Sequence, residues 1–245
     1  MAKQQILATS GGFVAGPVQQ SVRLGQMLLD ALARTKKTRP RVCLVYTASG
    51  DPAGYYAMSY EAFNAAGCDV TELKVFPQPS ADPTERLTTS DLVWVGGGSV
   101  ANLLSLWQLH GIDTAMKQAW AQGVILGGVS AGSLCWHIGG TTDSFGPTLQ
   151  PVTNGLALLP YGNGVHYDSE VQRRPLLHEL VANKTLPSLC FATDDRIGIW
   201  YDGIEPDLVV SDITMDPVTG SAAYRVELVS GAVVETRVGV GGSLR

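Results

Sequence analysis

Short apolar runs alternate, through the first half of this sequence, with longer segments whose apolar residues recur at helical intervals. Five runs have the length and character of buried strands: Gln5 to Thr9, Arg41 to Tyr46, Val70 to Phe76, Leu92 to Val95 and Val124 to Leu126. Between them, the pattern predicts helices over Gln19 to Arg34, Tyr55 to Ala66 and Val100 to His110. Strands separated by helices predict a three-layer α/β fold, with a mainly parallel sheet covered by helices on both faces.

From Leu186 onward the pattern changes to short strands joined by turn residues. The predicted strands are Ser188 to Ala192, Ile197 to Tyr201, Leu208 to Ser211 and Ala223 to Leu228. We expect them to form a β-rich end of the same sheet. The earlier run Thr141 to Gly164 is rich in Gly, Pro, Thr and Asn, and it predicts a long loop or a broken set of short elements.

The size and composition of the chain restrict its class. A length of 245 residues fits one α/β domain over residues 1–245, and 45% hydrophobic with 16% charged residues is typical of an ordered, packed protein. The net charge of −5 and the scattered basic residues argue against a nucleic-acid partner. No apolar stretch approaches the ~20 residues of a membrane span, so the expected location is the cytoplasm. The sequence is compatible with a homo-oligomer and leaves the oligomeric state open.

The cysteines and histidines form no ligand pattern. The four cysteines are far apart without CxxC spacing, and they are expected to be buried free thiols: Cys43, Cys68, Cys135 and Cys190. The four histidines are equally dispersed. We therefore expect no metal ion and no organic cofactor.

The segment Gly128-Val129-Ser130-Ala131-Gly132 matches the pattern G-x-S-x-G. It follows a predicted strand, and Ser133 to Ile138 can continue as a helix, which is the strand, turn and helix context of a nucleophile elbow. Such a turn exposes the serine hydroxyl at the carboxyl edge of the sheet. A tight structural turn is the alternative, because Gly and Ser are common at such positions.

A second glycine-rich turn, Gly96-Gly97-Gly98-Ser99, also joins a predicted strand to a predicted helix. In a parallel sheet both turns lie on one edge, so backbone N–H groups of Gly97 or Gly98 could join that of Ala131 as an oxyanion hole. Phosphate binding is the alternative, but the turn lacks both G-x-G-x-x-G spacing and a Walker lysine.

A serine nucleophile needs a base and a group that orients the base. His110 and His137 fall on predicted helices and His178 on a polar helix face, whereas His166 follows the long loop and can be presented to a pocket. Asp194 and Asp195 follow a predicted strand and are candidates for the orienting acid, with an ordinary polar turn as the alternative.

Together these segments resemble the peptidase E family of serine peptidases, which includes aspartyl dipeptidases and, more distantly, cyanophycinases. The resemblance extends from Ser10-Gly11-Gly12 through both glycine turns to the Asp-Asp turn. It implies a fold like that of the class I glutamine amidotransferases, with serine in place of their cysteine. It also implies Ser130 as nucleophile, His166 as base and Asp195 as acid, with Asp194 as the alternative acid.

The resemblance implies hydrolysis of dipeptides or short peptides through an acyl-enzyme, without a metal or cofactor. Family aspartyl dipeptidases pair the substrate aspartate with an arginine beyond the catalytic histidine, a role that Arg173 could take here if N-terminal Asp is preferred. Alternatively, Arg173 simply begins an amphipathic helix. Cyanophycinase-like or small-ester hydrolysis remains open, and so does a non-catalytic binding module on an amidotransferase-like scaffold.

Overall fold

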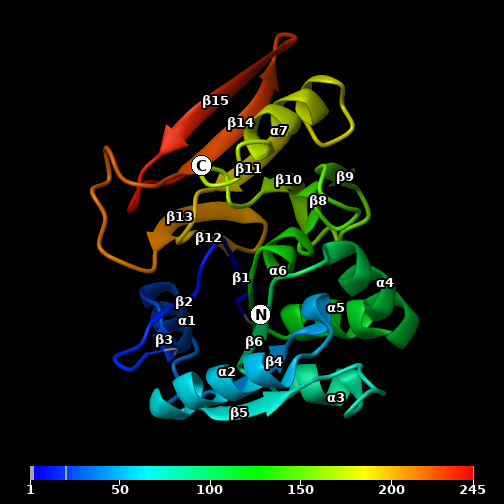
Figure 1. Cartoon of the computed structure of the whole chain (residues 1–245), viewed down its shortest axis with the longest axis vertical. Helices are drawn as coiled ribbons and strands as arrows, with labels where there is room; N and C mark the ends of the chain where they lie inside the picture. Colours follow the sequence, from blue (N-terminus) through cyan, green and yellow to red (C-terminus); the bar gives the residue numbers. More distant parts are fainter. Residues whose placement is uncertain (1–2, 20, 245) are drawn as a thin grey trace.

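Two β-sheets lie one above the other in this computed structural model, which describes residues 3–19 and 21–244 (Figure 1). The larger sheet has seven strands in the order β13-β12-β1-β7-β6-β4-β5. Its strands are β1 (Gln5–Thr9), β4 (Arg41–Val45), β5 (Asp69–Glu72), β6 (Leu92–Val95), β7 (Ile125–Val129), β12 (Ile197–Asp202) and β13 (Glu205–Ser211). The first five run parallel, and β12 and β13 pair antiparallel at one side.

Helices cover both faces of this sheet. They are α1 (Gln26–Arg34), α2 (Ala53–Ala65), α3 (Pro83–Thr88), α4 (Val100–His110), α5 (Ile112–Ala121) and α6 (Ala131–Leu134), with a 3-10 turn at Thr47–Ser49. The remaining helix, α7 (Arg173–Ala182), packs against the smaller sheet instead. Successive strand residues point to opposite faces. Leu7 and Trp94 accordingly pack with α1 and α2, whereas Ile6 and Val93 pack with α4 and α5. The predicted three-layer α/β arrangement is confirmed.

A second sheet was not expected from the sequence. Its order is β15-β14-β11-β10-β8-β9. Its strands are β8 (His137–Thr142), β9 (Gln150–Val152), β10 (Leu159–Gly164), β11 (Leu189–Thr193), β14 (Ala223–Val229) and β15 (Ala232–Val238). The expectation of one continuous sheet was therefore wrong for β11 and β14, because alternation predicts a strand but not its partners. The run Thr141 to Gly164 is a broken set of short strands.

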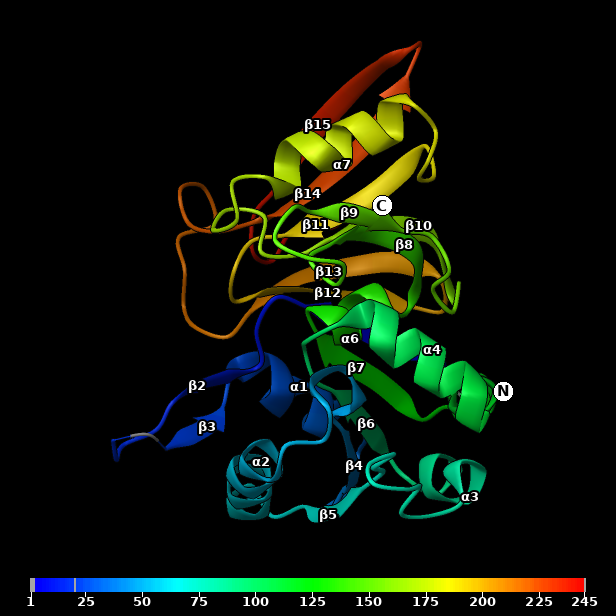
Figure 2. The same ribbon diagram turned by 45° about the vertical axis from the view of Figure 1, so that its right-hand side comes forward.

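Two helix predictions also need correction. The helix expected from Gln19 begins at Gln26, and Gln20 lies outside the described residues. The strands β2 (Phe13–Ala15) and β3 (Val22–Leu24) pair as a hairpin that projects beside α1 (Figure 2). Val22 and Leu24 suit a helical period and a strand period equally. The helix after Ser133 is also shorter than expected, since α6 ends at Leu134 and His137 begins a strand.

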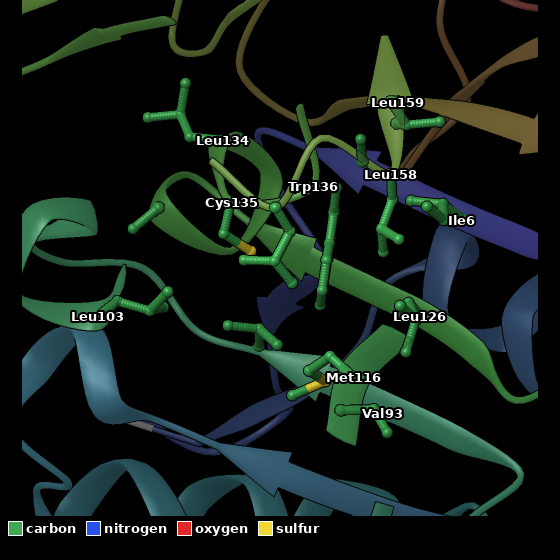
Figure 3. Close-up of a cluster of buried hydrophobic side chains, with 14 of the residues drawn as sticks. Ile6, Val93, Leu103, Met116, Leu126, Leu134, Cys135, Trp136, Leu158 and Leu159 are labelled. Carbon is green, nitrogen blue, oxygen red and sulfur yellow. The ribbon is translucent and has the colours of Figure 1, made fainter. Parts of the chain in front are cut away.

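An apolar core between the sheets supports the turn after β7. Trp136 is fully buried and lies with Cys135, Leu126 and Met116 in the cluster of Figure 3, which also includes Leu159 from the second sheet. Burying a large apolar side chain contributes about 1.5–3 kcal/mol, so this cluster holds α6 firmly. All four cysteines are buried and free, as expected. In the described part of the chain, no helix has the length and apolar character required to cross a membrane.

Candidate active site

Ser130 occupies the turn between β7 and α6 with φ 57° and ψ −112°. A residue other than glycine rarely adopts a positive φ, and such a conformation persists only where neighbouring contacts enforce it. Here the Ser130 N–H donates to Thr9 O at 3.0 Å, while the Ser130 carbonyl accepts from the N–H groups of Ser133 and Leu134 at 2.9 Å. The turn is thus fixed on one side by β1 and on the other by α6.

The two glycines that flank Ser130 permit close backbone approach. A Cβ on Gly128 would lie 2.3 Å from Gly132 O, and a Cβ on Gly132 would lie 2.2 Å from Val95 O. Neither position can accept a side chain without moving backbone. The glycines of the pattern therefore have a steric role in this turn.

The second glycine turn lies beside Ser130. A Cβ on Gly97 would sit 3.1 Å from Ser130 Cβ and 3.7 Å from its Oγ, so the missing side chain leaves the serine unobstructed. Gly96 and Ser99 donate their N–H groups to Val45 O and Ala48 O. Within residues 3–19 and 21–244, the backbone N–H groups of Gly97, Gly98 and Ala131 have no hydrogen-bond acceptor. Free amides beside a serine are the groups from which an oxyanion hole is built.

His166 and Asp195 meet at the neighbouring edge of the second sheet. β10 and β11 run parallel, so the residues that follow their carboxyl ends lie together. His166 Nδ1 is 2.6 Å from Asp195 Oδ1. Because a carboxylate oxygen accepts, this contact favours the tautomer with its proton on Nδ1, which leaves Nε2 free to accept a hydrogen bond.

Asp194, the alternative acid, points elsewhere. Its side chain is buried, and Oδ2 accepts from the Ala222 N–H at 2.8 Å and the Tyr224 hydroxyl at 3.1 Å. Burial raises the pKa of this carboxyl above its ordinary value. The geometry therefore assigns the imidazole contact to Asp195, whereas Asp194 binds the start of β14.

Ser10 connects the two parts of the site. Its Oγ accepts from the His166 N–H at 3.1 Å and lies 2.7 Å from Thr193 Oγ1. Thr9 and Ser10 are consecutive at the end of β1, and Thr9 holds Ser130 while Ser10 holds His166. The end of β1 therefore fixes the backbones of both residues. No hydrogen bond joins Ser130 Oγ to His166 Nε2 among the described residues.

Two residues that contact His166 or Asp195, namely Ser10 and Asp168, were not predicted from the sequence as part of the site. Ser10 was noted only as part of a glycine-rich turn, and nothing in its spacing from His166 indicates their contact. Asp168, two residues after His166, accepts the Asp195 N–H at 2.9 Å. Its proximity to His166 is the signal that could have identified it.

The other histidines have different surroundings. His137 is buried against Ser133 O, and burial lowers its pKa to about 4. His178 Nε2 is 2.8 Å from Glu235, which also binds Arg174 and the Tyr167 hydroxyl. His110 closes α4. The prediction that places His137 on a helix was wrong, because it begins β8.

Arg173 begins α7 and is buried. Its Nε donates to Glu170 at 2.8 Å and its Nη1 to Thr141 O at 2.5 Å. The guanidinium thus joins the start of α7 to β8. In residues 3–19 and 21–244, no three His, Cys, Asp or Glu side chains converge so that they could hold a metal ion.

Asp212 supports the first glycine turn. Its Oδ2 accepts the Gly12 N–H at 2.6 Å, and a Cβ on Gly25 would lie 2.1 Å from its Oδ1. Burial raises the pKa of Asp212 to about 6. This carboxyl fixes the chain between Ser10 and the start of α1.

Comparison with known proteins defines the class. A curated relative from Bacillus subtilis, "Uncharacterized peptidase YgaJ", is 36% identical over 233 residues, which cover 95% of this chain and 96% of the relative. A "Peptidase E" of Streptomyces coelicolor is 30% identical over 140 residues, or 57% of this chain and 56% of that protein. By this similarity the protein is a peptidase, a hydrolase of amide bonds.

The family follows from the match to the model of peptidase family S51 over residues 6–208, and the chain belongs to that family. The fold agrees with solved structures. A peptidase from an acI-B1 actinobacterium superposes with a TM-score of 0.69 at 14% identity, covering 99% of this chain and 96% of that one. A putative peptidase E protein from Listeria monocytogenes gives 0.60 at 17% identity, covering 86% and 99%.

Proposed function

We propose that the protein is a serine peptidase in which Ser130 is the nucleophile, His166 the general base and Asp195 the acid that orients it. The observation that carries the proposal is the 2.6 Å contact between His166 Nδ1 and Asp195 Oδ1, on a loop bound to the same β1 end as Ser130. This contact leaves Nε2 as the proton acceptor that a serine hydroxyl requires.

In the proposed reaction, His166 Nε2 takes the Ser130 proton as Oγ attacks the amide carbonyl. The free amides of Ala131 and of Gly97 or Gly98 stabilise the oxyanion. His166 then protonates the leaving amine, and water releases the acyl group by the same route. Catalytic hydrogen bonds often tighten only when substrate binds, which accommodates the absent Ser130–His166 bond.

The proposed substrates are dipeptides or short peptides. A pocket of about 560 Å³ lies between the 143–149 loop and residues 169–172, which follow His166 in the chain, and it can hold part of a small ligand. A preference for N-terminal Asp through Arg173 has less support, because Nε and Nη1 of this buried guanidinium are bound to Glu170 and Thr141.

A serine-directed fluorophosphonate tests the nucleophile. Wild-type protein should be labelled and should hydrolyse short peptides, and Ser130→Ala should do neither. Ser99→Ala is the matched control, since Ser99 caps α4 in the adjacent glycine turn and should leave labelling intact. If folded wild-type protein is not labelled, the non-catalytic alternative is favoured. Labelling with hydrolysis of esters alone would favour the small-ester alternative.

A further inference from the structure

A pocket of about 230 Å³ opens at the carboxyl ends of β6 and β7, beside Ser130. Val129, which precedes the serine, and Gly97, which lies against its side chain, both line this pocket. These two residues place the pocket next to the turn that carries Ser130. A substrate whose amide carbonyl reaches Ser130 can therefore present a neighbouring group to this pocket.

Four aromatic rings line the wall. Phe13 lies edge-on to Trp94 with centroids 6.3 Å apart, and Tyr46 lies edge-on to Tyr55 at 5.9 Å. Gly12 lies against the Trp94 ring, since a Cβ there would be 2.6 Å from it. The hairpin β2–β3 and α2 meet on this side of the sheet and complete the rim (Figure 2).

The pocket offers no ion-pair partner for a charged group. Among its described lining residues none carries a charge. The Tyr46 hydroxyl is hydrogen-bonded to Ser59 Oγ, and burial raises the pKa of Tyr46 to about 12, so this phenol stays neutral. A carboxylate in this pocket would lose hydration without gaining an ion pair, whereas an apolar group would gain contact with the rings.

We infer that this pocket receives an apolar side chain from the residue that flanks the scissile bond, so that peptides with Phe, Leu or Met there are preferred over peptides with Asp. The inference rests on the proposed function and specifies its substrate class. Filling an apolar pocket discriminates between substrates by roughly tenfold or more.

The test compares X-Ala and Ala-X dipeptides in which X is Phe, Leu, Ala, Asp or Lys. In one of the two series, kcat/KM for Phe or Leu should exceed that for Asp at least tenfold. A smaller ratio in both series overturns the inference while leaving the peptidase proposal intact.

A charge placed in the wall should invert this preference. Met58 lines the pocket from α2, and Met58→Lys should lower kcat/KM for Phe and Leu about tenfold relative to Ala and raise it for Asp. Ala57→Lys is the matched control, because Ala57 is exposed on the same helix and does not line the pocket. An unchanged Phe-to-Ala ratio in Met58→Lys contradicts the inference.

Binding to Ser130→Ala separates this inference from the failure of catalysis. Calorimetric titration of that variant with the same dipeptides should show tighter binding for Phe or Leu than for Asp. If wild type hydrolyses nothing but this order holds, the pocket assignment stands and the peptidase proposal fails. Equal or reversed binding refutes the pocket assignment.

Discussion

The hydroxyl of Ser10 accepts a hydrogen bond from the backbone N–H of His166 at 3.1 Å, although 156 residues separate them in the chain. His166 has a positive φ of 52°, which its side chain does not favour, so its conformation depends on such contacts. Ser10 is buried at the end of β1, next to the residue that binds Ser130. This contact fixes the imidazole relative to the nucleophile.

Ser10→Ala is expected to lower kcat about tenfold and to raise KM little, since it removes the acceptor of the His166 N–H and loosens the imidazole. The buried N–H left without a partner should also reduce the free energy of unfolding by about 1–3 kcal/mol. Steady-state kinetics and urea unfolding measure the two effects. Thr193→Val removes the other hydroxyl of the pair and keeps the His166 contact, so a loss of kcat as large as that in Ser10→Ala would argue against this role.

Asp195→Asn should lower kcat by roughly 10³–10⁴-fold, because an amide no longer enforces the Nδ1–H tautomer. Asp195 is partly exposed, so the melting temperature should change little. Asp194→Ala should instead lower the melting temperature clearly, because it leaves the Ala222 N–H and the Tyr224 hydroxyl without their acceptor. Its kcat should fall less than that of Asp195→Asn. If Asp194→Ala proves the more damaging to kcat, the acid has been misassigned.

Gly97→Ala should suppress activity in a folded protein. Its methyl group would lie 3.1 Å from Ser130 Cβ and obstruct the approach of a carbonyl. Gly132→Ala would instead place a methyl group 2.2 Å from Val95 O and destabilise the fold by about 1–3 kcal/mol. Fluorophosphonate labelling and thermal unfolding distinguish the two outcomes. Full labelling of Gly97→Ala would show that the second glycine turn does not confine the nucleophile.

Two buried groups should oppose each other in the pH dependence of stability. The folded-state pKa of His137 is lowered from 6.5 to about 4, so the unfolded chain binds more protons and stability is lost as pH falls through this window. The pKa of Asp212 is raised from 3.8 to about 6, so the folded chain binds more protons and stability is gained as pH falls from 6 toward 4. Each shift corresponds to about 3 kcal/mol.

A variant that lacks one of these two groups should therefore show the pH dependence of stability that the other group causes. In Asp212→Asn, acidification from pH 7 to pH 4 should reduce the free energy of unfolding by about 3 kcal/mol more than it does in wild type. His137→Phe should show the opposite change. Urea unfolding at both pH values measures these differences. If the free energy of unfolding of both variants changes in the same direction relative to wild type, the opposing effects of His137 and Asp212 are contradicted.

Much of the larger sheet could be predicted from the sequence. The limits of β1, β6 and α4 agree with their apolar patterns, and the elbow was placed between its strand and helix. The errors occur where a pattern is compatible with two structures. The segment Val22–Leu24 fits a strand as well as a helix, and α6 stops after one turn because the chain must enter β8. These outcomes depend on packing between distant segments.

By itself, the sequence determined the α/β class, the serine between steric glycines and the set of candidate partners, since these depend on local periodicity and on turns that only glycine permits. The tertiary structure decided which acid meets His166, because Asp194 and Asp195 are adjacent in sequence but bind different partners. It also decided that Arg173 is buried against Glu170 and that aromatic rings from β2, α2 and β6 surround one pocket. Such contacts join residues far apart in the chain, and no spacing encodes them.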